Sequence, residues 1–395
     1  MLKLQIVMNI FGDKWTFTSF GESHGAAIGG VLDGVPAGLH IDLQMIRTEL
    51  ERRAGKKTNP NNVLRTATGS PIEQSSSPVN GRETGVSPRA AREPDEVEWL
   101  SGVIRSVSPK DGLSAERSVS ETVCQQGDLV TLGTPIAFLI RNKDARPEDY
   151  EWLKHSYRVG HADRVYEQKY GIRDWRGGGR ASARETAARV VAGSLAKQEL
   201  ATKGVCIHAH LVQVGAETDP NKFADVIAAY QREGDSIGGI VECRITGLPV
   251  GTGEPIFDKL QAHLAYAVMS INACKGFEYG TGFGGVTQPG SVINAISGGI
   301  SGGISDGSEV VFRCVFKPTA STPKAFAQLQ NDQLQNDPYS EADRMNEVNK
   351  EMVNDKMINK GDQPDPVGRH DACVATRAVP VVEAMTALAL INLLD

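Results

Sequence analysis

The sequence predicts a globular fold that mixes helices and strands within one long chain. Of its 395 residues, 40% are hydrophobic and 23% are charged, which is typical of a soluble globular protein. Strand-like runs of β-branched and aromatic residues recur between longer segments in which apolar residues follow a helical spacing. A chain of this length can bury a large core, and we expect residues 1–395 to form a single domain that could comprise two halves.

The strands are predicted from apolar runs bounded by turn residues. Thr16, Phe17 and Thr18 form the first run, and Val31 and Leu32 resume the pattern after a turn rich in glycine. The later predicted strands are SVSETVC (118–124), PIAFLI (135–140), 204–215, 238–246 and EVVFRCVFK (309–317).

The helices are predicted from their caps and their apolar stripes. Residues 42–53 have Asp42 as a cap and turn Ile46 and Leu50 inward. The other predicted helices are 183–203, which ends at Gly204; 255–274, with Pro255 in its first turn; and 379–394, apolar nearly all round and therefore buried.

Two polar regions are predicted to be loop insertions. Residues 54–92 lack aromatic side chains and are rich in Ser, Pro, Asn and Gly, so we expect a mobile loop there. Residues 324–361 form the second polar region. The glycine-rich segment SGGISGGIS (297–305) leads directly into a strand, which favours an ordered loop close to a ligand.

Composition excludes several classes of protein. The net charge of -6 argues against a nucleic-acid partner. The six cysteines include no CxxC pair, which argues against a zinc site, favours a reducing cytoplasmic location and leaves no metal site predicted. No apolar run reaches the roughly 20 residues that span a membrane. Neither a P-loop nor a GxGxxG fingerprint occurs, so the commonest ATP and NAD sites are not expected.

Arginines are concentrated in one region of this acidic chain. Arginine suits bidentate recognition of phosphate and carboxylate groups, so the cluster favours a small polyanionic ligand. Its nine members are Arg141, Arg146, Arg158, Arg164, Arg173, Arg176, Arg180, Arg184 and Arg189.

The turn GESHG (21–25) carries Glu22, Ser23 and His24 between two predicted strands. Loops held by rigid strands often carry catalytic groups, whereas in a purely structural turn the same side chains would only satisfy backbone groups. The turn by itself leaves both interpretations open.

The segment YGIRDWRGGGRASARET (170–186) is the strongest local signal. Ser182 and Glu185 have the spacing of a capping box at the start of a helix. Gly177–Gly179 would let the backbone approach a ligand closely, and Arg180 and Arg184 would face one way, four residues apart. Because a helix start also attracts anions, the segment predicts a phosphate-binding site.

Together these motifs resemble the chorismate synthase family over nearly the full chain, and residues 157–193 are the most specific part. The motifs, in order, are GESHG (21–25), GHAD (160–163), QKYG (168–171), RGGGR (176–180), SARET (182–186), GEPIFDKL (253–260), MSINA (269–273), GGISGGIS (298–305), KPT (317–319) and GRHD (368–371).

The resemblance implies an α+β fold in which helices are sandwiched between antiparallel β-sheets, with pseudo-twofold halves, commonly as a homotetramer. It also implies the last step of the shikimate pathway for aromatic amino acids. In that reaction 5-enolpyruvylshikimate 3-phosphate loses phosphate by 1,4-anti elimination to give chorismate, and reduced FMN (FMNH2) is required although the reaction is redox-neutral.

The resemblance further implies roles for individual residues. His24, with Ser23 beside it, would protonate the departing phosphate. His161 would lie near flavin N1, and Asp371 would help to remove the C6 proton through flavin N5. The substrate contacts would be Arg53, Arg158, Arg184 and Arg369. The flavin contacts would be Arg180, Ala181, Ser182, Asn272, Ala273, Gly302, Lys317, Pro318, Thr319, Ala320, Ser321 and Arg369.

The chain departs from the family pattern in places. Ala181 replaces a usual Ser, and Ala372 replaces a usual Pro, but neither change removes an acid or base. A second substrate-side arginine cannot be assigned after Arg53, and Arg65 and Arg89 are candidates. Met1–Val7 is interpreted as an extension before a start at Met8.

Two other functions stay open on the sequence. A flavin oxidoreductase would need net hydride transfer from a nicotinamide, and a phosphometabolite-binding sensor would not need all of His24, His161 and Asp371. Some members of the family reduce FMN with NADPH themselves. This chain has no added reductase domain, so we expect it to depend on an external reductant.

Overall fold

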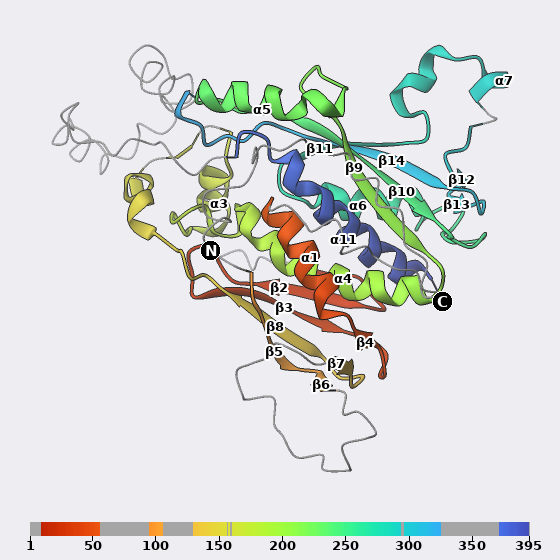
Figure 1. Ribbon diagram of the computed structural model, residues 1–395, viewed down its shortest axis with the longest axis horizontal. Helices are drawn as coiled ribbons and strands as arrows, with labels where there is room; N and C mark the ends of the chain where they lie inside the picture. Colours follow the sequence, from red (N-terminus) through yellow and green to blue (C-terminus); the bar gives the residue numbers. More distant parts are fainter. Residues whose placement is uncertain are drawn as a thin grey trace.

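Two antiparallel sheets enclose a layer of helices in the computed structural model of the protein (Figure 1). The structure describes residues 9–55, 95–105, 129–155, 157–158, 160–293, 296–324 and 371–394. The helices of the middle layer are α1 (Leu43–Ala54), α4 (Thr186–Thr202), α6 (Leu260–Met269) and α11 (Ala375–Leu393). This α+β sandwich confirms the expected fold class.

The first half of the chain builds one of the two sheets. Its strands lie in the order β1-β2-β3-β8-β5, and all neighbours are antiparallel. A smaller sheet in the order β4-β7-β6 accompanies it. The strands are β1 (Ile10–Phe11), β2 (Thr16–Phe20), β3 (Ala27–Asp33), β4 (His40–Ile41), β5 (Val97–Ser101), β6 (Val103–Arg105), β7 (Leu129–Thr131) and β8 (Ile136–Arg141).

The second half builds the other sheet with the same topology. Its strand order, β9-β10-β14-β11, matches the order β2-β3-β8-β5 in the first sheet. In both halves the chain forms two strands of the sheet, then a helix, then two further strands of the sheet and a second helix. Helices α1 and α4 belong to the first half, and α6 and α11 take the same places in the second. This repeat accounts for the pseudo-twofold arrangement. The strands are β9 (Cys206–Val214), β10 (Gly239–Thr246), β11 (Cys274–Tyr279) and β14 (Val310–Phe316).

Short elements connect these layers. The glycine-rich segment forms the hairpin of β12 (Ile300–Ser301) and β13 (Ile304–Ser305), and thus is ordered as predicted. The other elements are η2 (Pro147–His155), α3 (Asp163–Tyr170), η3 (Gly179–Ala181), η4 (Ala183–Glu185), η5 (Pro220–Lys222), α5 (Phe223–Arg232), η6 (Gly282–Thr287) and α7 (Gly290–Ile293).

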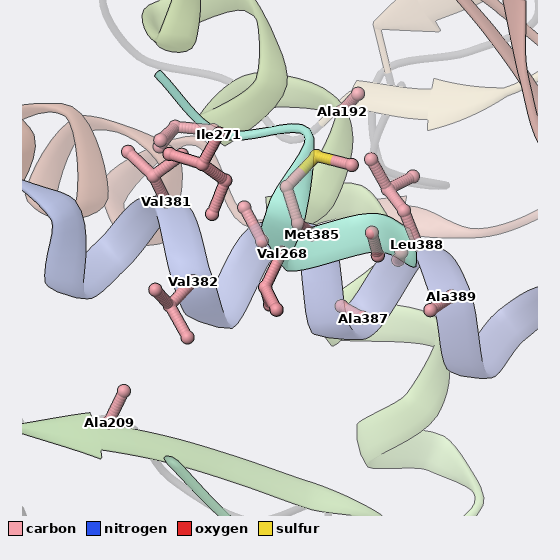
Figure 2. Close-up of a cluster of buried hydrophobic side chains, with 14 of the residues drawn as sticks. Ala192, Ala209, Val268, Ile271, Val381, Val382, Met385, Ala387, Leu388 and Ala389 are labelled. Carbon is pink, nitrogen blue, oxygen red and sulfur yellow. The ribbon is translucent and has the colours of Figure 1, made fainter. Parts of the chain in front are cut away.

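Helix α11 is the centre of a hydrophobic core that both halves share. Figure 2 shows Met385 and Leu388 of α11 near Val268 of α6 and Ala192 of α4. A Cβ on Gly193 would lie 2.3 Å from the Ala384 Cβ, so glycine allows α4 and α11 to touch. By length and composition α11 could also span a membrane, but 72% of its apolar window is buried inside the molecule, as in a core helix of a soluble protein.

A buried ion network joins three of these helices. Glu383 of α11 accepts hydrogen bonds from Lys197 of α4 at 2.6 Å and from Arg52 of α1 at 2.8 Å. Glu49 of α1 pairs with the same two cations. Burial alone would raise the pKa of Glu383, but Arg52 and Lys197 outweigh it and hold that pKa well below its ordinary value. The network therefore fixes the helices beside Arg53.

The helix predictions were partly confirmed. Helix α1 begins after Asp42, whose side chain accepts from Met45 N, and the buried segment predicted at 379–394 begins earlier, at Ala375. The start predicted at 255 was wrong, because α6 begins at Leu260, whose amide donates to Gly303 O. The loop predicted at 54–92 begins later than expected, because Ala54 is the last residue of α1 and Gly55 caps it. The rest of that loop, the loop predicted at 324–361 beyond its first residue, the strand predicted at 118–124 and Met1–Met8 lie outside the described residues.

Candidate active site

The GESHG turn joins β2 to β3 and buries two polar side chains. Ser23 and His24 are 1% and 7% exposed, and Ser23 Oγ lies 3.1 Å from His24 Nδ1. The turn requires glycine at Gly21, which has φ +92° and where a Cβ would lie 2.2 Å from Ala27 O. Asn142, directly after β8, donates to both Glu22 O and Gly25 O at 2.9 Å. The residue that follows β8 of the first sheet thus holds the turn that carries His24 in place.

Gly177–Gly179 brings the two histidine turns together. A Cβ on Gly177 would lie 2.2 Å from the His24 ring, and a Cβ on Gly178 would lie 2.8 Å from the His161 ring. Both glycines have positive φ, +62° and +87°, so the backbone conformation also requires them. Among the described residues, the side chains that these two glycines approach most closely belong to the site itself. Because neither glycine has a side chain, the rings of His24 and His161 pack against successive residues of one turn.

His161 belongs to a charged cluster at the start of α3. Its Nδ1 lies 3.0 Å from Asp163 Oδ1, and Arg158 donates to both oxygens of Asp163 at 2.8 and 3.0 Å. Burial alone would raise the pKa of Asp163, but hydrogen bonds from His161 and Arg158 lower it well below its usual range. Arg158 Nη2 also lies 3.1 Å from His161 Nδ1, so Arg158 and Asp163 together hold this edge of the imidazole.

Arg53 and Arg184 share a carboxylate that the sequence analysis did not identify. Arg53 Nη1 donates to Asp95 Oδ2 at 3.2 Å, and Arg184 Nη1 donates to Asp95 Oδ1. The three side chains are only 3%, 7% and 4% exposed. Burial, together with Arg377 and Arg184, lowers the pKa of Arg53 to about 9 despite the attraction of Asp95. This is a buried site dense in positive charge.

Asp371 joins this cluster from the second half. It pairs with Arg377 of α11 at 2.5 Å, and Arg377 Nε donates to Arg53 O at 3.0 Å. The backbone of Asp371 accepts a hydrogen bond from the Thr319 hydroxyl at 2.8 Å. Asp371 therefore lies between the arginines and the KPTAS segment (317–321).

The KPTAS segment connects the remaining predicted flavin residues. Lys317 N donates to Ala273 O at 3.0 Å, and Ser321 Oγ accepts from Arg158 Nη1 at 3.3 Å. Asn272 Nδ2 donates to Ala181 O at 2.9 Å, which links the end of α6 to the turn before α4. Partial burial, and to a smaller extent the neighbouring Lys275, lowers the pKa of Lys317. A bound anion would offset both effects. Pro318 and Ala320 lie within the same segment.

One predicted flavin residue, Gly302, is not brought into this group. Gly302 lies in the exposed turn between β12 and β13, and β14 separates that hairpin from Lys317 (Figure 1). The backbone of Gly298, next to the hairpin, accepts from Val311 N at the start of β14. Arg369, with Arg65 and Arg89, lies outside the described residues.

The predicted capping box was wrong in detail. Ser182 Oγ accepts from Arg184 N rather than from Glu185 N, because a 3-10 turn, η4, precedes α4. Glu185 pairs instead with Arg189 at 3.0 Å. Arg180 and Arg184 consequently do not form a helical i, i+4 pair: Arg180 donates to Gly21 O and Ser19, whereas Arg184 donates to Asn142 Oδ1.

The arginine-rich stretch is also less concentrated in space than in sequence. Arg158, Arg180 and Arg184 lie in the site, but others pair with carboxylates of the protein. Those paired arginines are Arg141 with Glu98, Arg146 with Asp144, Arg173 with Glu167, Arg176 with Asp174 and Arg189 with Glu185.

Sequence reasoning missed Asp95, Asn142 and Arg377. Arg377 carried a usable signal, because it is the single cation of the apolar helix α11. Asp95 and Asn142 lie among other polar residues, and no local pattern distinguishes them. Glu22, noted in the turn, lies near Gly179, and burial, opposed by Arg180, raises its pKa.

The architecture matches that of a known enzyme class. A crystal structure described as chorismate synthase superposes with a TM-score of 0.60 and 23% sequence identity, covering 97% of this chain and 92% of that one. At this level of identity the comparison shows the fold, an α+β sandwich of helices between antiparallel sheets.

Sequence comparison then gives the family. The family model "Chorismate synthase" matches residues 15–68 and 71–348. Chorismate synthases of Christiangramia forsetii and Porphyromonas gingivalis are each 39% identical, covering 97% of this chain and 96% and 94% of theirs. That of Phocaeicola vulgatus is 38% identical, over 98% and 97%. The chain belongs to the chorismate synthase family, whose members are lyases, and the resemblance seen in the sequence is confirmed.

Proposed function

We propose that the protein converts 5-enolpyruvylshikimate 3-phosphate to chorismate and phosphate by 1,4-anti elimination, with reduced FMN as cofactor. One observation carries the proposal: His24 and His161, from separate loops, both pack against the turn of Gly177 and Gly178, beside buried arginines. A site for losing phosphate from a polyanion needs that combination of proton donors and fixed positive charge. Family membership favours this lyase reaction over the flavin oxidoreductase and the phosphometabolite sensor.

The arginines would bind the anionic substrate. Arg53, Arg158 and Arg184 are held by hydrogen bonds to the framework, so their positions are set before a ligand arrives. Helices α4 and α11 begin close to the same residues, and their N-termini add the positive ends of two helix dipoles. A substrate with one phosphate and two carboxylates suits this concentration of positive charge.

We assign the acid to His24 and the base to Asp371. Ser23 Oγ at His24 Nδ1 orients the ring, so the proton for the departing phosphate is delivered from Nε2. Asp371 accepts the proton that leaves carbon C6. Arg377 donates a hydrogen bond to one oxygen of this carboxylate and holds it in place.

The residues at the end of α6 fit a bound flavin. Asn272 Oδ1 is buried and has no hydrogen-bond partner among the described residues, so an N–H of a bound ring would satisfy it. The positively charged side chains of Lys317 and Lys275 suit a phosphate. Bound FMN in its reduced form would supply electron density transiently while phosphate leaves. His161, oriented by Asp163, would present Nε2 to that ring.

The remaining assignments extend the same proposal. The flavin contacts would be Arg180, Ala181, Ser182, Asn272, Ala273, KPTAS (317–321) and Arg369. We propose a cytoplasmic homotetramer, in keeping with the cysteine content and the family. We expect FMN to be reduced by an external donor, and turnover in air with NADPH and purified protein alone would contradict that.

The decisive test is anaerobic. The purified protein is incubated with 5-enolpyruvylshikimate 3-phosphate and dithionite-reduced FMN, and chorismate is measured by its absorbance or by chromatography. We expect chorismate and phosphate in equal amounts, with no net oxidation of the flavin. Stoichiometric flavin oxidation would indicate an oxidoreductase, and tight binding without product would indicate a sensor.

A further inference from the structure

The carboxylate of Asp95 occupies the position between Arg53 and Arg184 that an anionic ligand would take. Its two oxygens accept from different guanidinium groups, Oδ2 from Arg53 Nη1 at 3.2 Å and Oδ1 from Arg184 Nη1. A phosphate or carboxylate group of a ligand bridges two arginines in the same way. Asp95 lies two residues before β5 begins at Val97, so its backbone is outside the sheet's hydrogen-bonded ladder.

Both arginines are fixed by the framework on their other sides. Arg53 Nε donates to Thr186 Oγ1 at 3.1 Å, and its Nη2 donates to Ala183 O at 2.8 Å. Arg184 Nε donates to Asn142 Oδ1 at 3.0 Å, and its Nη2 to Arg141 O at 3.3 Å. The Nη1 groups are therefore the ones that meet Asp95. Exchanging Asp95 for another anion would require no movement of either guanidinium.

The charges of the cluster also require an anion at this point. Arg184 and Arg377 lie close enough to Arg53 to lower its pKa, and among the described residues the carboxylates of Asp95 and Asp371 oppose them. Burial would raise the pKa of Asp95, but Arg53 and Arg184 outweigh it and lower that pKa. Without Asp95 or a replacement, the two buried arginines and the partly buried Arg377 would face one carboxylate, which is strongly unfavourable.

We propose that Asp95 is a resident counter-ion that stands in for an anionic group of the substrate and is displaced when the substrate binds. The inference rests on the proposed function for the identity of that substrate. It makes Asp95 a specificity-determining residue, because only a ligand whose phosphate or carboxylate replaces the resident charge gains access to Arg53 and Arg184. Monoanions without further contacts would compete poorly with a tethered carboxylate.

Asp95→Asn tests this by removing the competing charge while keeping the shape of the side chain. The probes are inorganic phosphate and acetate, each titrated by calorimetry into wild type and variant, without flavin or substrate. We expect at least one anion to bind the variant roughly tenfold more tightly, since a charge-assisted competitor has been removed. The anion with the larger gain identifies which substrate group takes the place of Asp95. Unchanged or weaker binding of both anions would overturn the proposal.

Glu98→Gln is the matched control. It removes a carboxylate from the same strand region, but Glu98 pairs with Arg141 at the surface, where both side chains are about half exposed. Its anion affinities should equal those of wild type. Anion binding is measured without turnover. A negative chorismate assay would therefore leave this test valid, and a negative result here would leave the chorismate assay valid.

A second measurement does not depend on a folded variant. A crystal structure of the wild-type protein with 5-enolpyruvylshikimate 3-phosphate should have the Asp95 carboxylate out of hydrogen-bond distance of both Nη1 atoms and a substrate oxygen in its place. Asp95 still bridging Arg53 and Arg184 in that complex would overturn the proposal.

Discussion

The two halves of the molecule share one topology but bring different chemistry to the site. Helix α1 of the first half ends at Arg53 and Ala54, and α6 in the equivalent place of the second half is followed by Asn272 and Ala273. Arg184 directly precedes α4, and Asp371 lies just before α11. The repeat thus gathers four helix ends at one place, and the residue types at those ends decide what each half binds.

The difference between the halves is mainly one of charge. The first half contributes two buried arginines and their counter-ion Asp95, a set suited to a polyanion. The second half contributes the amide of Asn272, with an unpartnered buried acceptor among the described residues, and the carboxylate of Asp371. We infer that the first half carries the substrate-binding arginines, whereas the flavin lies between the turn before α4 and the second-half residues Asn272 and 317–321.

Local signals allowed much of the fold to be predicted from the sequence. The cap at Asp42 and the apolar periodicity of α11 lie within the helices themselves, so they identified those helices. The start of α6 was missed because its amide partner, Gly303, lies far along the chain. The capping box was misread because residue spacing does not distinguish a 3-10 turn from the first turn of an α-helix.

The candidate site was predictable from motifs, but its connections were not. His24, His161 and Asp371 were proposed from the resemblance, and the structure brings their surroundings together through Gly177, Gly178 and Thr319. The pairing of Asp95 with Arg53 and Arg184 spans 42 and 89 residues. No periodicity or spacing reports a contact across such separations, which only tertiary packing creates.

The largest expected effect tests whether each half supplies one catalytic group. His24→Ala in the first half and Asp371→Asn in the second should each lower kcat by roughly 10²–10⁴, as for a lost acid or base. Substrate and FMN should still bind, because the arginines and Asn272 are unchanged. Anaerobic turnover and calorimetric binding measure this. If either variant weakens substrate binding but keeps near wild-type turnover at saturation, that residue is a binding group.

The next largest effect concerns the ion network that joins the halves. Glu383→Gln should lower the free energy of unfolding by about 3–5 kcal/mol at pH 7, because Lys197 and Arg52 lose a buried counter-charge. Since the pKa of Glu383 is lowered by folding, its contribution is present above the ordinary value of 4.5 and decreases as pH falls below it.

Urea unfolding of wild type and Glu383→Gln from pH 7 down to pH 3 checks both parts. The difference between the two proteins should become smaller with acidification. Glu242→Gln, a partly exposed carboxylate in the second sheet, is the control and should change stability little. A stability difference that grows as the pH falls below 4.5 would contradict the lowered pKa of Glu383 in the folded protein.

Single substitutions at the helix ends test which residues bind the substrate and which bind the flavin. Arg53→Lys cannot reproduce the bonds to Thr186, Ala183 and Asp95, so substrate affinity should fall by about 10²-fold with little change for FMN. Asn272→Ala should weaken FMN by about tenfold and affect substrate less. Arg47→Lys, exposed on the same helix α1, is the control. Equal losses for both ligands in both variants would remove the distinction between the halves.

The smallest expected effect compares the starts of α4 and α11. Ser182 Oγ accepts from Arg184 N, whereas no side chain caps α11, and the nearby Thr376 hydroxyl donates to Cys373 O instead. Ser182→Ala should therefore cost about 1 kcal/mol of unfolding free energy, as for a lost N-cap. Thr376→Ala should cost less, because it leaves no amide unpaired. Urea midpoints of the two variants measure the difference. Because Ser182 accepts a hydrogen bond from Arg184 N, substrate affinity should fall together with stability in Ser182→Ala but not in Thr376→Ala. A larger loss from Thr376→Ala would mean that the second helix start, not the first, depends on its hydroxyl, and the asymmetry between the halves would be reversed at this point.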